Sequence, residues 1–452
     1  MAAQTGNRNL HLMESTPVWV SIIRLALPMM FSMIAQLVYN MTDTFFIGQT
    51  GDPNMVAGIS LAMPLFMVSQ GVGNIFGVGA SSYISRMLGA REAEIAKRTN
   101  AVSFYTTILA GVVITIVLLL FRKSILHVIG TSDVTFPYAD SYFTIISAFI
   151  VIALLNISLS GQIRSEGATD KAMIGTLIGI IINIILDPVF ILVFNMGTAG
   201  AAWATVIGQA ASLVYLLWCF MSPHTMLSIH PRDFKPSGKI YGEILKIGLP
   251  AALSNIVMSL AMAVRNLMAA SYGDMVIAGM GVTIRVESLS FMLIMALAMG
   301  YQPFAGFNYG AKNYGRLKKG MKITFMYTTA LALFFVGAFA LAGRSIIALF
   351  INDAQTITAG ASFLHAFLFG LPVLGIQMTI MVTFQALGKP VLGTIVSLGR
   401  QCLFYIPLVY VFNHFWGFEG FVFSQPVADI ATTVIALFLV RGLLKELKHH
   451  EK

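Results

Sequence analysis

Charged residues are scarce in this chain of 452 residues. Only 10% of its side chains are charged and 57% are hydrophobic, whereas soluble domains typically carry about 25% charged residues. A deficit of this size excludes an ordinary soluble domain. Apolar stretches of about twenty residues recur along the whole chain instead, and this is the length that crosses a bilayer as a helix. The sequence therefore predicts an all-α integral membrane protein.

Several kinds of chemistry are also missing. The two cysteines, Cys219 and Cys402, both fall in apolar stretches, so neither a disulfide framework nor a thiolate metal site is expected. No phosphate-binding GxxxxGK[ST] loop is present, which disfavours ATP-driven transport. Of the eight histidines only His365 lies well inside an apolar stretch, so no metal cluster or nucleophile–base set is expected. We therefore expect no enzyme activity and no cofactor.

Twelve apolar spans are predicted. Backbone groups in lipid must be satisfied within the segment, so each span is expected to be a helix. Residues 1–17 are polar and lack a signal-peptide pattern, so the first span is expected to insert as itself. The spans are placed at 18–47, 55–80, 100–121, 139–163, 172–194, 199–221, 245–270, 275–303, 322–342, 360–386, 392–412 and 418–440.

The net charge of +9 reflects topology rather than nucleic-acid binding. Of the 28 basic residues, 21 lie on the side that holds the termini and the loops after even-numbered spans. Three lie on the other side and four lie inside spans. Loops rich in Lys and Arg stay in the cytoplasm, so both termini are predicted to be cytoplasmic.

The two halves of the chain repeat one another at an offset of about 222 residues. RLALP at 24–28 aligns with KIGLP at 246–250, Gly89 with Gly310, and Gly167 with Gly388. Each half has six spans, so both halves have the same orientation, and parallel repeats of this kind are typical of secondary transporters. The predicted organisation is a first lobe at 1–221, a Pro-rich cytoplasmic linker at 222–244 and a second lobe at 245–452.

Two acids inside the first half have no basic residue near them in the sequence. Asp43 lies in the first span and Asp187 in the fifth, both predicted in the outer half of the bilayer. Asn183 precedes Asp187 by four residues and shares its helix face, and Thr205 lies at a similar depth. Two carboxylates in a low-dielectric site cannot both stay ionised without a cation.

This cluster can therefore share a proton, bind a metal cation or receive a cationic ligand. Oxygen atoms of Asp43, Asn183, Asp187 and Thr205 suit a small hard cation such as Na⁺. In the alternative interpretation, the acids only accept hydrogen bonds from neighbouring helices. Pro28 and Pro188 interrupt the helical hydrogen bonding near the cluster, which makes them candidate hinges or ordinary membrane-helix kinks.

The second half balances its buried charges differently. Its spans contain acidic and basic residues at comparable depths, so these residues are expected to pair with one another. When the two halves are aligned, Asp43 of the first half matches a basic residue, Arg265, in the second. The residues expected to pair are Arg265, Arg285, Glu287, Arg400 and Asp429.

The ordered set of local sequences resembles the multidrug and toxic compound extrusion (MATE) family, in its DinF-like branch and of the MepA type. The resemblance covers essentially the whole chain. It rests on ALPMM at 26–30, YNMTDTFFIG at 39–48, GVGASSYISRMLGA at 77–90, NIILDPVFI at 183–191, GAAWATVIGQ at 200–209 and KIGLP at 246–250.

The resemblance implies two pseudo-symmetric six-helix lobes in a V-shaped fold. It also implies export of amphipathic, often cationic compounds by antiport with H⁺ or Na⁺ at the plasma (inner) membrane. Asp43, Asn183, Asp187 and Thr205 match the coupling residues of the DinF-like branch. Tyr142 and Ser160 occupy neighbouring positions around the same cavity. The NorM-like branch instead uses acids in the seventh and tenth helices. Here the seventh-helix position is near Met258 and the tenth span contains no acid.

Two other functions fit parts of the pattern. A lipid-linked oligosaccharide flippase shares the two-lobe architecture, but it should have a basic cavity for its anionic lipid. A membrane receptor or scaffold would need no buried carboxylates. We therefore expect a monomeric multidrug antiporter whose partners are small amphipathic molecules and the lipid bilayer, with a cation site in the first lobe.

Overall fold

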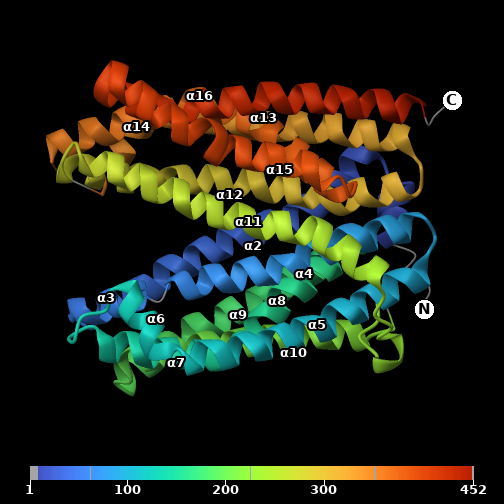
Figure 1. Ribbon diagram of the computed structural model, residues 1–452, viewed down its shortest axis with the longest axis horizontal. Helices are drawn as coiled ribbons and strands as arrows, with labels where there is room; N and C mark the ends of the chain where they lie inside the picture. The colour runs from blue at the N-terminus through green and yellow to red at the C-terminus, as the bar shows by residue number, and fades with distance from the viewer. Residues whose placement is uncertain (1–8, 62, 224, 351–352, 450–452) are drawn as a thin grey trace. The chain divides into compact units, whose positions relative to one another are not determined.

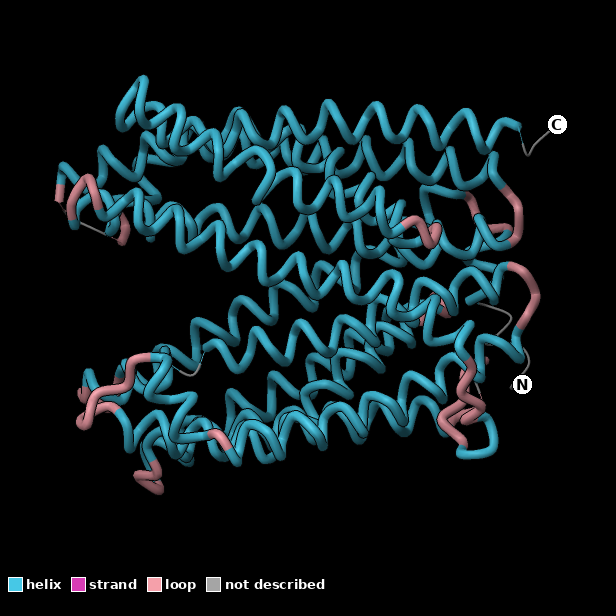
Figure 2. The backbone as a smooth tube through the Cα atoms, in the orientation of Figure 1, coloured by secondary structure: helices cyan, strands magenta, loops and turns pink. Residues whose placement is uncertain are grey.

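The protein is helical throughout the part that the structure describes. The computed structural model describes residues 9–61, 63–223, 225–350 and 353–449, and no strand occurs within them. Figure 2 shows helices joined by short loops. This agrees with the fold class predicted from the apolar spans, because a helix satisfies its backbone hydrogen bonds internally.

The chain divides into two compact units (Figure 1). The first comprises Met1–Ser15 and Phe31–Ala252, and the second comprises Thr16–Met30 and Leu253–Lys452. The first unit holds α3 (Pro53–Leu61), α4 (Met63–Gly89), α5 (Ala93–Leu120), α6 (Arg122–Ile129), α7 (Phe136–Ala148), α8 (Ile150–Ser165), α9 (Thr169–Pro188), the π-helix η1 (Val189–Val193), α10 (Gly197–Met221) and the 3-10 helix η2 (Pro231–Asp233). The second holds α12 (Asp274–Gly310), α13 (Tyr314–Ala348), α14 (Ala354–Ala386), α15 (Pro390–Leu398), the π-helix η3 (Gly399–Tyr405) and α16 (Ile406–His449).

Two long helices are shared between the units. Helix α2 (Val18–Gly48) belongs to the second unit up to Met30 and to the first unit from Phe31, and α11 (Gly238–Ala270) changes unit after Ala252. Each helix contains a proline two residues before the change, Pro28 in α2 and Pro250 in α11. The helices therefore exchange their first halves at equivalent positions of the repeat.

The exchanged half of α11 packs closely within the first unit. A Cβ atom on Gly248 would lie 2.1 Å from the carbonyl oxygen of Ile75, so only glycine permits this approach to α4. At the end of the same contact, Arg86 of α4 forms an ion pair of 2.8 Å with Glu243. The exchanged half of α2 is held similarly in the second unit. A Cβ atom on Gly300 would lie 2.5 Å from the Cα atom of Ala26.

The repeat is visible in the backbone conformation. Left-handed φ angles recur at equivalent places, as at Gly167 (86°) and Gly388 (74°) and at Arg91 (65°) and Lys312 (55°). A non-glycine residue rarely adopts this conformation, so its presence at two equivalent positions is specific evidence for the repeat. The offset of about 222 residues inferred from the sequence is thus reproduced by the turns that connect the helices.

Within the described residues, ten helices are long and apolar enough to cross a membrane. Helices α7 and α8, which are bent by 53° relative to each other, are together long and apolar enough to be an eleventh. One of the ten, Pro390–His449, has 60 residues, which is about three times the length that one crossing needs. Its backbone is non-helical at Gly417. The Ser424 hydroxyl lies 3.5 Å from the carbonyl oxygen of Leu408, so the chain reverses direction there, and its 60 residues are long enough for two crossings. All twelve predicted spans therefore have a helical counterpart.

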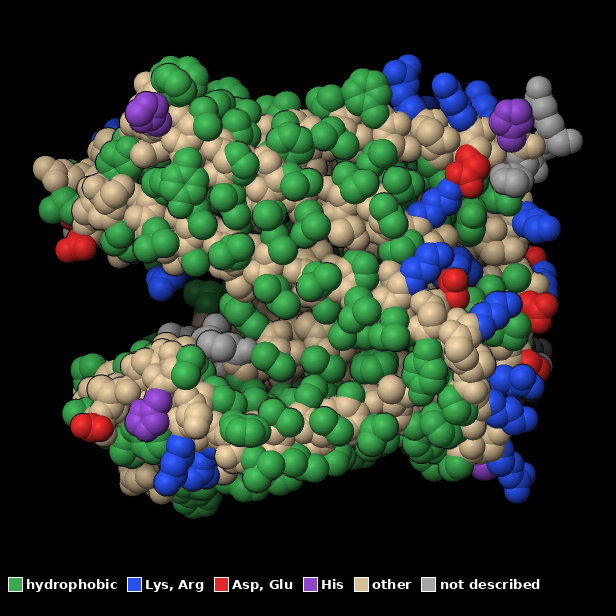
Figure 3. Space-filling model, viewed as in Figure 1, with side chains coloured by type: hydrophobic (Ala, Val, Ile, Leu, Met, Phe, Trp, Pro, Cys, Tyr) green, Lys and Arg blue, Asp and Glu red, His purple; other side chains and the backbone are tan. Residues whose placement is uncertain are grey.

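The helices extend further than the apolar stretches predicted. Helix α4 continues to Gly89 rather than residue 80, and α13 begins at Tyr314 rather than residue 322. The reason is physical, because hydropathy ends at the membrane interface whereas helical hydrogen bonding continues into the polar region. Lys and Arg side chains gather at one end of each unit, and the middle is largely hydrophobic on the face in Figure 3.

Candidate functional site

The candidate site of the first unit is built on α9 and α10. Asn183 and Asp187 lie one turn apart on α9, so both face the same neighbour. The two helices cross at Gly208, where a Cβ atom would lie 2.5 Å from the carbonyl oxygen of Gly179. This close approach brings Thr205 of α10 against Asn183.

The Asn183 amide connects the three side chains. In the orientation that satisfies both of its ends, the amide nitrogen donates to Oδ2 of Asp187 at 3.0 Å, and the amide oxygen accepts from the backbone N–H of Thr205 at 3.1 Å. The hydroxyl oxygen of Thr205 lies 3.4 Å from the same end of the amide. The three residues predicted to act together are therefore brought together.

The described side chains of the site are almost completely buried. Asp187 has no exposed surface, and Asn183 and Thr205 are each 3% exposed. A buried carboxylate is expensive when it is ionised, and a hydrogen-bond donor or a cation reduces that cost. The arrangement can thus bind a proton or a small cation, or stabilise the ionised carboxylate before a proton or cation binds.

The structure does not place every predicted member of the site. Asp43 lies in α2, but its side chain is outside the part that the structure describes, so its role stays a prediction. Tyr142 of α7 is 3% exposed and packs in an apolar cluster with Ile47 of α2. Ser160 of α8 is half-buried, and no hydrogen bond in the described part of the chain joins it to Asp187.

Of the two predicted hinge prolines, Pro188 lies at a change of helix type and Pro28 lies within a continuous helix. Pro28 lies inside α2, close to the point where the helix changes unit. Pro188 is the last residue of α9 and is followed directly by the π-helix η1. Proline lacks an N–H, and the π-helix that follows departs from the α-helical hydrogen-bond pattern, so the backbone next to Asp187 is locally irregular. Such π-helical turns often occur at functional sites. The sequence indicated the proline but not the π-helix.

The buried charges of the second unit pair with one another, as the mixture of signs predicted. Nε of Arg400 lies 2.7 Å from Oδ1 of Asp429, which also accepts from Gln425 at 3.0 Å. Arg265 and Glu287 form a second pair at 3.6 Å. Sequence reasoning missed Gln425, although its position one turn before Asp429 was a usable signal.

Arg285 differs from these paired residues. Its side chain is exposed, and it forms no ion pair within the residues that the structure describes. The expectation of mutual pairing is therefore wrong for this residue, because it faces away from the contact that joins α12 to its neighbours in the unit.

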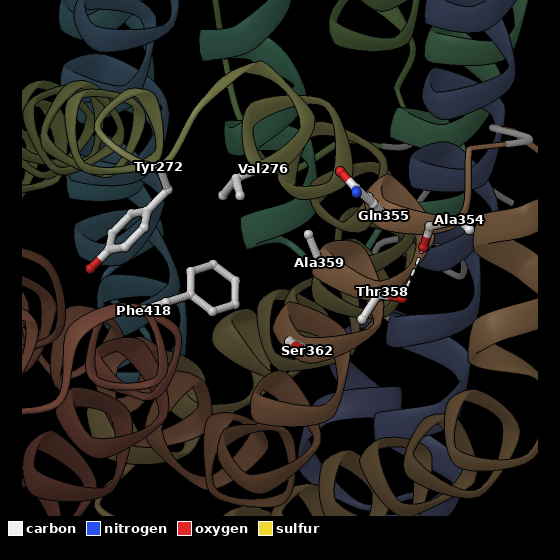
Figure 4. A pocket seen from close by; sticks show the side chains of 8 residues that line it. All are labelled: Tyr272, Val276, Ala354, Gln355, Thr358, Ala359, Ser362 and Phe418. Atoms are coloured by element: carbon white, nitrogen blue, oxygen red, sulfur yellow. Dashed lines mark hydrogen bonds between the residues drawn. The ribbon is translucent and has the colours of Figure 1, made fainter.

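The second unit also contains an open cavity of about 460 Å³ at the end away from the C-terminus. Figure 4 shows that the rings of Tyr272 and Phe418 lie on one side of it and the start of α14 on the other. The lining residues are Tyr272, Val276, Ala354, Gln355, Thr358, Ala359, Ser362 and Phe418. None of them is charged, and none belongs to the predicted site. Within the described residues, no group of three His, Cys, Asp or Glu side chains is arranged to hold a metal ion.

Comparison with known proteins gives consistent results. The family model MatE matches residues 28–189 and 250–411, so the second match begins 222 residues after the first. The multidrug export protein MepA of Staphylococcus aureus (strain NCTC 8325 / PS 47) is 30% identical over 434 residues, which covers 96% of each chain.

Solved structures also match this chain over almost its full length. A MATE protein crystallised in complex with MaL6 has a TM-score of 0.92 at 27% identity and covers 98% of this chain and 99% of its own. A multidrug resistance MATE family transporter of the MOP superfamily, in an outward-facing conformation, has a TM-score of 0.91 at 28% identity. That match covers 97% of this chain and 98% of the other.

Proposed function

The chain belongs to the multidrug and toxic compound extrusion (MATE) family, and we propose that it exports amphipathic, often cationic organic compounds by antiport against a cation. The name of its relative MepA describes multidrug export. The observation in this chain that carries the proposal is the buried Asp187 in hydrogen-bond contact with Asn183, beside Thr205. A carboxylate without solvent suits reversible neutralisation by a cation.

The exchange works through competition for one charge. When the site is ionised, it attracts an organic cation. When a proton or Na⁺ enters, the charge is neutralised and the organic cation is released. Linkage is reciprocal, so the organic cation must weaken binding of the coupling ion by the same factor. Asp43 is expected to share this charge with Asp187.

The orientation of Asn183 supports H⁺ as the coupling ion. Na⁺ requires oxygen ligands, whereas in the orientation that satisfies both ends of the amide the NH₂ group faces Asp187 and the oxygen faces the N–H of Thr205. A proton on the carboxylate needs no such ligand and leaves this hydrogen bond in place. A Na⁺ ion would require the amide to rotate and break both contacts.

The distribution of basic residues supports a multi-pass protein of the plasma membrane with cytoplasmic termini. The 21 basic residues of one side include those in the loops at Arg91 and Lys312. A lipid-linked oligosaccharide flippase is not favoured, since the buried site of the first unit is acidic and would repel a pyrophosphate group.

The proposal is tested with purified protein in liposomes that contain a fluorescent organic cation. A pH gradient and a Na⁺ gradient are imposed separately on wild type, Asp43→Asn and Asp187→Asn. Transport driven by the pH gradient alone and lost in both variants is the expected result.

Glu94→Gln is the matched control, because it also neutralises one carboxylate of the first unit. Glu94 forms an exposed ion pair with Lys97, and such pairs contribute little to stability. Full transport by Asp187→Asn would exclude the site, and transport driven only by Na⁺ would exclude the proton.

A further inference from the structure

Arg285 lies at an unusual depth for an exposed cation. It is the twelfth residue of α12, about 17 Å along the helix axis from Asp274 at a rise of 1.5 Å per residue. The hydrocarbon core of a bilayer is about 30 Å thick, so an α12 that begins at one surface places Arg285 near the middle. Apart from Glu287, the span from Met275 to Met299 contains no other charged residue.

The neighbouring charges do not neutralise Arg285. Glu287 forms an ion pair with Arg265, and Asp429 forms an ion pair with Arg400. Glu287 also lies on a different face of α12, two residues along the helix. The second unit thus pairs Glu287 and Asp429 with other arginines and leaves Arg285 exposed without a carboxylate among the described residues.

The buried face of α12 explains which way Arg285 points. Gly279, Thr283 and Val286 of α12 are buried, and the Thr283 hydroxyl donates to the carbonyl oxygen of Gly360 on α14 at 2.9 Å. Arg285 lies two residues after Thr283, which is about 200° around the helix at 100° per residue, so it is almost opposite this contact. It therefore projects from the side of α12 that the unit leaves open.

Small residues lie one turn before and one turn after Arg285 on that side of the helix. A Cβ atom on Gly281, one turn before it, would meet no atom within 4 Å. Ser288, one turn after it, is half-buried, and its hydroxyl donates to the carbonyl oxygen of Ile284 at 2.6 Å, close to the helix backbone. The half-buried Leu289 adds an apolar side chain at the edge. The guanidinium is consequently accessible over a shallow strip formed by Gly281, Arg285 and Ser288.

An accessible guanidinium in a low-dielectric region has a specific ligand chemistry. Its planar donors match a carboxylate or a phosphate, which they bind in a bidentate manner. We propose that the strip formed by Gly281, Arg285 and Ser288 binds the anionic group of an amphiphile, and that Leu289 contacts the apolar part of the same molecule.

This inference rests on the proposed function, that amphipathic compounds bind the chain, and it names the residue that would hold their anionic group. Compounds that carry a carboxylate beside a cationic ring system would be accepted, with the anionic group at Arg285. The same chemistry is offered by an anionic phospholipid headgroup, and the experiment separates these two sources.

The test uses a matched pair of probes, a xanthene dye with a free carboxylate and the methyl ester of the same dye. Binding of each dye is measured by fluorescence polarisation to protein in detergent, without any ion gradient. In Arg285→Gln, the carboxylate dye should bind about tenfold or more weakly, since a charge-assisted hydrogen bond is lost, and the ester should bind within about twofold of wild type. Arg285→Lys keeps the positive charge but loses the bidentate geometry, so its affinity for the carboxylate dye should lie between those of wild type and Arg285→Gln.

Two further variants keep the result interpretable. Arg344→Gln removes an exposed arginine near the end of α13 and should change neither dye. Gly281→Leu covers the strip without removing the charge and should weaken the carboxylate dye selectively, even if Arg285→Gln does not fold. Equal weakening of both dyes, or no change of either in Arg285→Gln and Gly281→Leu, would overturn the proposal.

The source of the anionic group is identified by repeating the assay in nanodiscs of neutral lipid with and without an anionic phospholipid. If the anionic lipid displaces the carboxylate dye from wild type, a headgroup occupies Arg285 in the membrane. If it does not, the site receives the amphiphile itself. Because no gradient is applied, failure of gradient-driven transport would leave this result intact, and failure of the binding test would leave transport intact.

Discussion

Gly208 of α10 approaches Gly179 of α9 so closely that a Cβ atom on Gly208 would lie 2.5 Å from the Gly179 carbonyl oxygen. In the second unit, at the offset of 221 residues given by Gly167 and Gly388, Gly179 is replaced by Arg400. Arg400 pairs with Asp429 of α16 at 2.7 Å. Equivalent helix contacts are therefore stabilised differently in the two units. Close packing of glycines stabilises the contact in the first unit, and a buried ion pair stabilises it in the second.

We predict that Gly208→Ala separates α9 from α10 and weakens the contact between Thr205 and Asn183. Overpacking of a close contact costs about 1–3 kcal/mol, so the free energy of unfolding in detergent should fall by that amount and gradient-driven transport should decrease. Gly337→Ala on α13 is the control, since a Cβ atom there meets nothing within 4 Å. Equal effects of the two substitutions would contradict this interpretation.

We predict that Arg400→Met destabilises the second unit strongly. It leaves the carboxylate of Asp429, which is 2% exposed, without its guanidinium partner, and breaking a buried pair in this way costs about 3–5 kcal/mol. Chemical unfolding followed by intrinsic fluorescence measures the change.

The double variant Arg400→Met with Asp429→Leu provides the control for this prediction. It removes both charges and should recover much of the lost stability, because apolar replacement of both partners is often neutral. A double variant as unstable as the single one would show that packing rather than charge explains the loss.

We predict a pH-dependent contribution from Glu166, which lies between α8 and α9 and is 3% exposed. Burial raises the pKa of Glu166 above its ordinary value of 4.5, and the hydrogen bonds from the Met226 N–H and the Thr225 hydroxyl only partly offset this. With a raised folded-state pKa, the stabilisation is fully present below pH 4.5 and is lost as the pH rises through the folded-state pKa.

Glu166→Gln keeps an acceptor for the Met226 N–H, which donates to Glu166 at 2.9 Å, and removes the titration. Thermal unfolding should therefore show that wild type loses stability relative to Glu166→Gln as the pH rises from 4.5. The loss is at most about 1.4 kcal/mol per pH unit within the window. Parallel pH profiles of the two proteins would contradict the prediction.

The sequence predicted the spans and the repeat because both depend on hydropathy and on local turn residues. Asn183 and Asp187 were recognisable as partners because a spacing of four places them on one helix face. Thr205 was placed with them by depth, and the structure brings the three residues into contact, while their role in coupling stays a prediction.

Other features depend on packing between segments that are distant in the sequence. Nothing in an apolar run tells which unit it packs against, so the exchange of the first halves of α2 and α11 after Met30 and Ala252 was not predicted. The π-helix after Pro188 was missed for a similar reason, since π-helical and α-helical turns have the same apolar composition. Pairing of opposite charges was predicted, but the exception of Arg285 required the helix orientation.

The central claim is that a proton at Asp187 and an organic cation exclude each other. The most direct measurement adds a saturating organic cation to purified protein in a weakly buffered solution and follows the pH with an indicator dye. The account predicts release of up to about one proton per protein in wild type and none in Asp187→Asn. Equal proton release by both proteins, or binding of the cation to wild type without any release, would contradict it.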